Sequence, residues 1–480
     1  MTKSEIQHGG IPPSAWRIHE SRGKGRGHPC PRDARLEGAE TCGQGCPRPF
    51  VIWAWAFATP AHFLLKRALV CAIECGQTNS MKPCSAIGPR AAAISSHFAP
   101  VTSFFVAGIL LTLLAATPVS SQPLVSPEVR ADGRVTFRLK APSATNVQVH
   151  CEGVKESRME NDGQGVWSLT TSPLEPDIYS YSFTVDGLRT IDLNNPLMKY
   201  NLLNSESQVH VPGPATLLWE LSDVPHGQIH HHFYKSAVAC DDRDFYVYTP
   251  PGYDPSARKR YPVLYLLHGY SDDASAWTSV GFANVILDNL IARKEAMPMI
   301  IVMPLGYGTM EVVKAGWGGP RWRELFQINM DKFKQAFLEE VMPQAEKAYR
   351  ILPEANARAI AGLSMGGSES LLVGINNLDR FAWIGAFSSG GLNTNFDAQF
   401  PKLDKKANDR LRLLWIGCGE QDGLLAGNRQ FSEWLTTREI RHTWVQTPGQ
   451  HSFRVWRRYL AQFAPLLFQD ARKQPSSLVQ

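Results

Sequence analysis

The main part of this sequence lacks an excess of charge of either sign. The chain has 480 residues, with 49 Lys and Arg against 44 Asp and Glu. Residues 1–121 hold 12 of the basic and 6 of the acidic side chains, which leaves 37 against 38 in residues 122–480. Proteins that bind nucleic acid or anionic membranes usually carry a basic surface. The near balance therefore argues against both kinds of partner for residues 122–480.

The sequence also has little that would hold it in a membrane. The uncharged apolar run over residues 101–116 is shorter than the roughly 20 residues that a spanning helix needs. It follows a short basic segment that starts at Met81 and precedes small residues, which is the order of a secretory signal peptide. We therefore expect residues 81–121 to be a signal peptide cleaved near Ser121/Gln122, and the mature protein to be secreted or periplasmic without stable membrane insertion.

Residues 1–80 lack the apolar periodicity of a folded domain. We interpret them as a disordered leader, or as upstream sequence included by a wrong start codon. Their Cys30, Cys42 and Cys46 fit none of the zinc-site spacings, and no histidine pair completes them, so no metal site is expected there.

Cysteine is scarce in the rest of the chain. Only Cys151, Cys240 and Cys418 follow the expected cleavage point. An odd number of cysteines cannot all pair within one chain. The sequence leaves open whether Cys151 pairs with Cys240.

Residues 122–225 have the pattern of a small immunoglobulin-like β-sandwich followed by a linker. Short runs alternate between polar and apolar residues, with turn sequences between them. Several such strands across about 90 residues indicate two packed antiparallel sheets. The expected strands cover residues 134–139, 146–149, 166–169 and 179–185.

Part of this region resembles an immunoglobulin-like early-set domain, whose relatives include glycogen-binding-type carbohydrate-binding modules and the N-terminal domains of α-amylase-family enzymes. The resemblance implies that Trp167, Tyr179 or Tyr181 stacks on sugar rings. The alternative interpretation is that these aromatic side chains fill the core or the cross-strand faces. The segments that carry the resemblance are residues 165–168, 178–187 and 192–196.

Residues 226–475 alternate between apolar strands and amphipathic helices, which predicts a doubly wound, mostly parallel α/β sheet. The strand expected at residues 261–267 is apolar throughout, as is typical of the centre of such a sheet. The other expected strands cover residues 244–249, 299–303, 358–361, 381–387, 411–418 and 443–446, and the clearest helices cover residues 283–293 and 328–348.

Gly362-Leu363-Ser364-Met365-Gly366 fits the pattern G-x-S-x-G of the nucleophile turn in α/β-hydrolases. In that turn the chain leaves a strand and enters a helix within a residue or two. Glycines two positions before and after the serine let the strand and the helix approach without a side-chain clash. Because an expected strand precedes the motif and a helix start follows it, we predict that Ser364 is a nucleophile.

Two later residues complete a candidate triad. Asp422 and His451 each follow an expected strand, and the carboxyl ends of parallel strands meet at one edge of a sheet. The order Ser, Asp, His is that of α/β-hydrolases. We expect His451 to take the proton of Ser364 and Asp422 to orient the imidazole. The competing acid is Glu420, and the competing bases, residues 230–232, precede the first strand expected in the domain.

An oxyanion formed at Ser364 needs preformed N–H donors. We expect them from Met365, directly after the nucleophile, and from Tyr270, in the loop after the strand at 261–267. His268 is expected to position this loop rather than to titrate. The chemistry needs no metal or organic cofactor, and the sequence of this domain has no phosphate loop or metal-ligand cluster.

The stretch from residue 306 to residue 324 lacks a long period and is rich in aromatic residues. One hypothesis is that Tyr307, Trp317 and Trp322 line an acyl or sugar pocket beside Ser364, because loops of this length are often functional. The alternative is a surface loop packed by its own aromatic side chains.

Four segments of the domain resemble the putative-esterase, or esterase-D-like, family. That family includes bacterial feruloyl esterases of carbohydrate esterase family one, enterochelin esterases and mycolyltransferases. The resemblance covers about residues 226–470 and departs from the feruloyl esterases at Gly449-Gln450-His451-Ser452, where these often have Gly-Gly-His-Thr. The segments are residues 267–273, 282–291, 360–367 and 449–458.

With an early-set domain in front, the chain most resembles secreted feruloyl or acetyl esterases that accompany xylanases. The resemblance implies a serine esterase that releases feruloyl or acetyl groups from plant-polysaccharide or sugar esters. Alternatives within the fold are enterochelin-type trilactone hydrolysis and acyl transfer to a sugar. An alternative of another class is a non-catalytic carbohydrate-binding protein.

Overall fold

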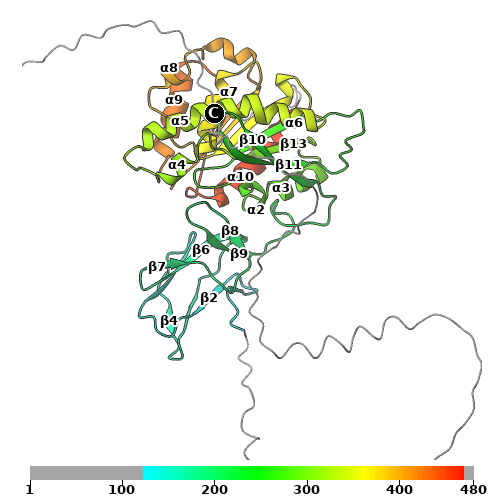
Figure 1. The fold of residues 1–480 in the computed structure, drawn as a ribbon. Coiled ribbons are helices and arrows are strands. Elements are labelled where there is room, and N and C mark those ends of the chain that lie inside the picture. The colour runs from blue at the N-terminus through cyan, green and yellow to red at the C-terminus, as the bar shows by residue number, and fades with distance from the viewer. Residues whose placement is uncertain (1–122, 470–480) are drawn as a thin grey trace, which may run out of the picture. The chain divides into compact units, whose positions relative to one another are not determined.

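The computed structural model describes residues 123–469. The leader predicted over residues 1–80, which includes Cys30, Cys42 and Cys46, and the signal peptide predicted over residues 81–121 lie outside the described residues. All described residues belong to the second of the chain's two units, residues 122–480, and many of their helices and strands are labelled in Figure 1. Within the described residues, none of the helices is both long enough and apolar enough to cross a membrane.

Residues 128–211 form two antiparallel sheets, with strand orders β1-β2-β5-β4 and β3-β6-β9-β8 and with β7 paired to β6. Both sheets contribute to one apolar core, for example through Phe137 and Tyr181. The predicted β-sandwich is therefore confirmed, while its assignment as an early-set domain stays a prediction. The strands are β1 (Glu128–Val129), β2 (Val135–Lys140), β3 (Val147–Cys151), β4 (Glu160–Asn161), β5 (Val166–Thr170), β6 (Asp177–Val185), β7 (Leu188–Thr190), β8 (Met198–Lys199) and β9 (Glu206–Val211).

Two of the three predicted sugar-stacking residues lie in the core of the sandwich. The exposed fractions of Tyr179 and Tyr181 are 2% and 0%. Their hydroxyl groups donate hydrogen bonds to Glu175 O and to Asp192 Oδ2. The prediction of a sugar contact is wrong for both, because alternate residues of β6 point into the core. Trp167 is half-buried and donates to Ala141 O, and its sugar contact stays a prediction.

Cys151 and Cys418 are free thiols. Cys151 therefore does not pair with Cys240, which answers the question left open by the sequence. Burial raises the pKa of both free thiols to about 12. Such thiols are weak nucleophiles at neutral pH.

The second part of the unit is an eight-stranded sheet in the order β10-β11-β13-β12-β14-β15-β16-β17. The six strands from β12 to β17 pair in parallel, while β10 and β11 form an antiparallel edge. The strands are β10 (Gln228–Ser236), β11 (Asp241–Thr249), β12 (Val263–Leu267), β13 (Ile300–Pro304), β14 (Arg358–Leu363), β15 (Trp383–Phe387), β16 (Leu413–Gly419) and β17 (Thr443–Thr447).

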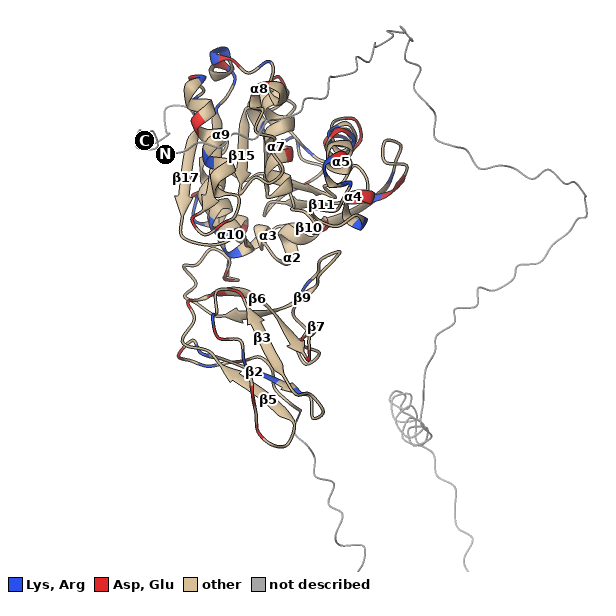
Figure 2. Ribbon diagram, turned by 90° about the vertical axis from the view of Figure 1, so that its left-hand side faces the viewer, with Lys and Arg blue, Asp and Glu red and all other residues tan. Residues whose placement is uncertain are grey.

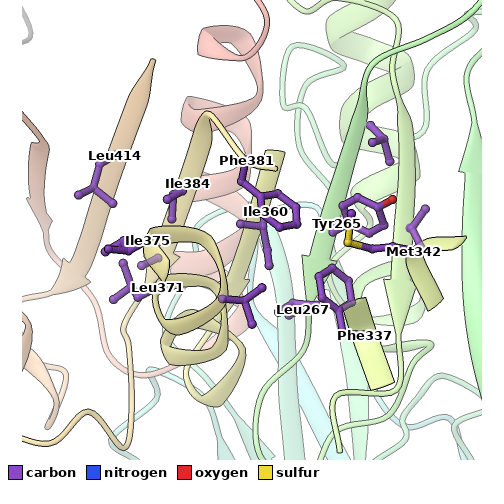
Figure 3. Close-up of a cluster of buried hydrophobic side chains, with 14 of the residues drawn as sticks. Tyr265, Leu267, Phe337, Met342, Ile360, Leu371, Ile375, Phe381, Ile384 and Leu414 are labelled. Atoms are coloured by element: carbon purple, nitrogen blue, oxygen red, sulfur yellow. The ribbon is translucent and has the colours of Figure 1, made fainter. Parts of the chain in front are cut away.

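Both faces of this sheet are covered by helices. Successive residues of a strand point to opposite faces, so Tyr265 and Leu267 of β12 enter one apolar cluster and Leu264 and Leu266 another. The first cluster includes residues of α5, α7 and α9, and the second those of α3 and α10. Figure 3 shows part of the first cluster, with Leu371 and Ile375 of α7 near Ile360 and Ile384 of the sheet. The predicted doubly wound sheet is confirmed. The helices are α2 (Ala276–Ser279), α3 (Ala283–Ala292), α4 (Glu311–Lys314), α5 (Trp322–Ala336), α6 (Met342–Ala348), α7 (Met365–Asn376), α8 (Phe396–Gln399), α9 (Leu425–Thr437) and α10 (Phe453–Phe463).

Two elements differ from the sequence-based expectation. Residues 230–232 do not precede the first strand of the sheet but lie within it, on β10, an edge strand with little buried surface to reveal it. The helix expected from residue 328 begins at Trp322, so the last part of the predicted loop is helical. Figure 2 shows acidic and basic residues interspersed along the ribbon, in keeping with the balanced charge of residues 122–480.

Candidate active site

Ser364 lies in a strained turn between β14 and α7. Its backbone has φ 53° and ψ −117°, a conformation that residues other than glycine rarely adopt. A Cβ on Gly362 would lie 2.5 Å from Gly366 O, and a Cβ on Gly366 would lie 2.4 Å from His268 O. Both glycines of the motif are therefore required for the close approach of strand, helix and neighbouring loop.

Replacing Gly366 by alanine tests this packing. Because the new methyl group meets backbone atoms that cannot move aside, we expect Gly366→Ala to lower the free energy of unfolding by about 1–3 kcal/mol, measured by denaturant unfolding. Gly427→Ala is the matched control, since a Cβ there meets nothing within 4 Å. Equal stability of the two variants would contradict the packing argument.

The structure brings together the three residues predicted to form a triad. His451 Nε2 lies 2.9 Å from Ser364 Oγ, and His451 Nδ1 lies 2.8 Å from Asp422 Oδ2. The Asp422 carboxylate accepts a hydrogen bond from Nδ1–H, which leaves Nε2 as the acceptor for the Ser364 hydroxyl. This tautomer is the one that a general base at Ser364 requires.

Asp422 is held as a buried carboxylate. Its side chain has no exposed surface, and its Oδ1 accepts a hydrogen bond from Leu424 N–H at 2.8 Å. Burial alone would raise the pKa of Asp422, but the hydrogen bond and charge of His451 and the Leu424 N–H lower the pKa below its ordinary value. The competing acid Glu420 is exposed, so Asp422 is the residue placed to orient the imidazole.

Residues that the sequence analysis missed fix the loops of the acid and the base. Gln421 N–H donates to Gly449 O at 3.0 Å, and Gln421 Oε1 accepts from Gly449 N–H at 2.6 Å. The Trp456 ring lies edge-on to His451 with centroids 4.8 Å apart, and its Nε1–H donates to Ser388 Oγ. No motif marks these residues, because their roles depend on loops that meet only in the fold.

The loop His268-Gly269-Tyr270 passes directly against the nucleophile. A Cβ on Gly269 would lie 3.3 Å from Ser364 Cβ. His268 is buried, with Nδ1 2.8 Å from Gly269 O, and Gly306 N–H donates to its Nε2 at 2.7 Å. Burial lowers the pKa of His268, so the neutral ring links two loops, which agrees with the positioning role predicted for it.

The two predicted oxyanion donors are the N–H groups of Met365, which follows Ser364 in the chain, and of Tyr270, which belongs to this loop. Within residues 123–469, neither Met365 N–H nor Tyr270 N–H donates a hydrogen bond, so both are available to a ligand. Their role as oxyanion donors stays a prediction.

Of the three aromatic residues predicted to line a pocket, Tyr307 is buried in the core. Tyr307 is 1% exposed, and its hydroxyl donates to Asp272 O beneath the loop. The prediction that it lines a pocket is wrong, because its ring packs in the core with Phe326 and Met365. Trp317, by contrast, is 53% exposed.

Four aromatic side chains, Tyr270, Trp317, Trp322 and Phe326, contact one another in a row that we call the aromatic wall. Ring centroids are 5.2 Å apart for Tyr270–Trp317, 4.4 Å for Trp317–Trp322 and 5.1 Å for Trp322–Phe326. Phe326 contacts Gly391, and a Cβ on the preceding Gly390 would lie 3.4 Å from Ser364 Oγ. Trp322 and Phe326 also line a cavity of about 970 Å³ that includes Gly391.

A second cavity, of about 590 Å³, opens at Ser364 and His451. Its walls come from both parts of the unit: Tyr270 and Asp272 from the α/β part, and Lys155, Lys199 and Asn201 from the sandwich. The sequence analysis did not foresee a contribution of the sandwich here. Among residues 123–469, no three His, Cys, Asp or Glu side chains are grouped in a way that could hold a metal ion.

Glu369, on α7, is a further buried group beneath the site. It is fully buried, and neither carboxyl oxygen has a hydrogen-bond partner among the described residues. A Cβ on Gly306 would lie 3.3 Å from both Glu369 Oε2 and His268 Cε1, so the carboxyl group lies near His268. Burial raises the pKa of Glu369 well above its ordinary value of 4.5.

The raised pKa of Glu369 predicts a pH-dependent stability difference. The unfolded chain releases this proton near pH 4.5 while the folded chain retains it, so wild-type stability falls as the pH rises above that value. Glu369→Gln lacks this loss, and its free energy of unfolding relative to wild type should increase from about pH 4 to about pH 8. Glu433→Gln, at an exposed position on α9, is the control. A difference independent of pH would contradict the prediction.

Comparisons with known proteins show what this chain is similar to. Residues 236–467 match the family model described as putative esterase. Over 352 residues the chain is 29% identical to an endo-1,4-beta-xylanase/feruloyl esterase of Xylanibacter ruminicola, an alignment that covers 71% of this chain and 46% of the relative. Over 271 residues it is 28% identical to Esterase Rv1288 of Mycobacterium tuberculosis, covering 47% of this chain and 56% of the relative.

The chain thus spans about half the length of the curated relatives it matches. Among solved structures, the enterochelin esterase from Shigella flexneri has a TM-score of 0.54 and 18% identity, covering 72% of this chain and 95% of that one. This likeness shows a shared fold. The match to the putative esterase family covers residues 236–467, which include Ser364, Asp422 and His451.

Proposed function

We propose that residues 226–475 form a serine carboxylic-ester hydrolase that works through an acyl-enzyme intermediate. The observation that carries this proposal is the hydrogen-bonded chain from Ser364 Oγ through His451 to Asp422, with distances of 2.9 Å and 2.8 Å. The strained turn at Ser364 and the adjacent cavity support it. Few structural roles would need a serine hydroxyl, an imidazole and a buried carboxylate hydrogen-bonded in this order, with the imidazole in the tautomer that accepts from the serine.

The chemistry assigns each group a step. Ser364 Oγ attacks the ester carbonyl carbon while His451 Nε2 takes the hydroxyl proton, and Asp422 stabilises the imidazolium that forms. The oxyanion is stabilised by the N–H groups of Met365 and Tyr270, each worth about 3 kcal/mol in a dry site. His451 then protonates the leaving alcohol, and a water molecule activated by the same imidazole hydrolyses the acyl-enzyme.

For the substrate we propose feruloyl or acetyl esters of plant polysaccharides or sugars. Tyr270, at one end of the aromatic wall, lines the cavity that opens at Ser364, and the wall offers flat apolar surface to a planar acyl group. The cavity at His451 adds polar and charged groups, including Lys155, Lys199 and Asn201, beside the position of a leaving alcohol. The name of the Xylanibacter ruminicola relative, which couples a xylanase with a feruloyl esterase, points to the same class of substrate.

A panel of esters tests this proposal. We expect turnover of methyl ferulate and acetylated xylan that is lost in Ser364→Ala. Turnover of a catecholate trilactone alone would instead favour the enterochelin-type alternative, and acyl transfer to added sugar would favour the transferase alternative. If no ester showed Ser364-dependent turnover, the alternative of a non-catalytic carbohydrate-binding protein would be favoured.

The aromatic wall makes a separate prediction about selectivity. Trp317→Ala should raise KM for methyl ferulate about 2–10-fold, since an aromatic pair contributes about 0.5–1.5 kcal/mol, and should leave KM for p-nitrophenyl acetate unchanged. Phe233→Ala, at a position on β10 that is 76% exposed, is the control for loss of a surface aromatic. An equal rise in KM for both esters would contradict the proposed contact with the acyl ring.

We also propose that the protein is exported, with residues 81–121 removed. The support is the order of a basic segment, an apolar run and small residues in the sequence. N-terminal sequencing of exported protein should find a start near Gln122, and a start upstream of Met81 would contradict the proposal.

A further inference from the structure

Helix α10 begins two residues after His451 and carries three arginines, Arg454, Arg457 and Arg458. All three converge on one carboxylate of the sandwich, Asp177 at the start of β6. Arg457 Nη2 lies 2.7 Å from Asp177 Oδ1, while Arg458 Nη1 and Arg454 Nε lie 2.6 Å and 3.2 Å from Asp177 Oδ2. We call these four residues the arginine clamp.

The centre of the clamp is buried. The side chains of Asp177 and Arg457 are 0% and 1% exposed. Burial alone would raise the pKa of Asp177, but the charges of Arg457 and Arg458 outweigh it and lower the pKa. Asp177 therefore remains a carboxylate, with the guanidinium groups as its partners inside the protein.

Aromatic rings outside α10 hold the other two arginines. The Arg454 guanidinium lies 4.3 Å from the centroid of the Tyr179 ring, and that of Arg458 lies 4.8 Å from the Trp219 ring. These are cation–π distances. Tyr179, which the sequence suggested as a sugar contact, thus faces the helix that follows the catalytic histidine.

The clamp and the sandwich also contact the α/β part outside α10. Arg457 Nη1 donates to Val280 O, in the segment after the loop that carries Tyr270. From the sandwich, Asn201 Nδ2 donates to Asp272 Oδ1 at 3.0 Å, and Leu202 N–H donates to Ser271 O at 2.7 Å. The sandwich is thereby bonded both to the helix of the base and to the loop of a predicted oxyanion donor.

From these contacts we infer that Asp177 is a positioning residue for His451, so that the sandwich domain completes the geometry of the active site. The inference rests on the serine-esterase function proposed above. His451 stands two residues before α10, and its ring packs against Trp456 of that helix. A shift of α10 would therefore be passed directly to the distance between Nε2 and Ser364 Oγ, and a misplacement of about 1 Å can cost about 100-fold in rate.

This role differs from that of a sugar-binding module. A binding module raises the local concentration of a polymer and changes KM for that polymer. A positioning domain changes kcat, and it does so for a small ester that carries no sugar. The two roles are separated by kinetics with p-nitrophenyl acetate.

The test compares Asp177→Asn with Glu128→Gln in the full chain. Asp177→Asn keeps the shape of the side chain and removes its charge, and we expect kcat for p-nitrophenyl acetate to fall at least about 10-fold with KM within about 2-fold. The rate at which a fluorophosphonate labels Ser364 should fall in parallel. Glu128→Gln breaks another ion pair of the sandwich, with Arg138 at 2.6 Å, which touches no part of α10, and it should keep wild-type kcat.

A second variant guards against loss of folding. Arg457→Lys keeps the charge opposite Asp177 but cannot bond Asp177, Ile178 O and Val280 O together as the guanidinium does, so it should also lower kcat more than KM. If Asp177→Asn does not fold, the kcat of Arg457→Lys tests the positioning role instead. Wild-type kcat in either folded variant would overturn the inference. If wild type itself shows no Ser364-dependent hydrolysis, the proposed function fails instead, which the parallel wild-type assay reveals.

Discussion

Replacing Ser364 by alanine should lower kcat for p-nitrophenyl acetate by about 10⁶-fold, the size of loss found when the nucleophile of a serine hydrolase is removed. The reason is that Ser364 Oγ is the atom 2.9 Å from His451 Nε2. No other hydroxyl group is expected to take its place, because among residues 123–469 His451 Nε2 forms a hydrogen bond only with Ser364 Oγ. The measurement is steady-state hydrolysis followed by p-nitrophenolate release.

The variant also needs a folding control. Alanine removes one oxygen and leaves the backbone conformation as it was, so the thermal unfolding curve should overlap that of wild type. Residual activity above about one thousandth of wild type, in a protein with a wild-type unfolding curve, would show that Ser364 is not the nucleophile.

Asp422→Asn should lower kcat by about 10⁴-fold. The asparagine amide keeps the volume of the carboxyl group but can donate a hydrogen bond to Nδ1, which favours the imidazole tautomer with Nε2 protonated. In that tautomer His451 cannot accept the Ser364 proton. The loss should appear in kcat across neutral pH, measured with the same ester.

Glu420→Gln is the matched control for this prediction. Glu420 is two residues away and exposed, whereas Asp422 is buried against His451. We expect wild-type kcat for Glu420→Gln. A larger loss in Glu420→Gln than in Asp422→Asn would show that the acid of the site is wrongly assigned.

The residues of the hydrogen-bonded chain could be named from the sequence because each is tied to local structure. Ser364 stands in a motif whose glycines are required, because a Cβ at Gly362 or Gly366 would lie 2.5 Å or 2.4 Å from a backbone oxygen atom. Asp422 and His451 follow strands β16 and β17, and strand ends in a parallel sheet meet at one edge. The period of apolar residues was enough to place most strands within a few residues.

What the sequence could not show depends on contacts between distant segments. Tyr179 and Tyr307 look the same in sequence as exposed aromatic residues, and only the packing of β6 and of the loop after β13 buries them. Asp177 and Arg457 are separated by 280 positions. Gln421 and Trp456 likewise act through loops that meet only after the sheet has formed.

The central claim is that Ser364 carries the acyl group during turnover. The most direct measurement is mass spectrometry of the protein, acid-quenched within milliseconds of mixing with methyl ferulate or p-nitrophenyl acetate and then digested. The account predicts a feruloyl or acetyl adduct on the peptide that contains Ser364, and no such adduct in Ser364→Ala. Turnover of both esters with no adduct on that peptide, or an equal adduct in Ser364→Ala, would contradict it.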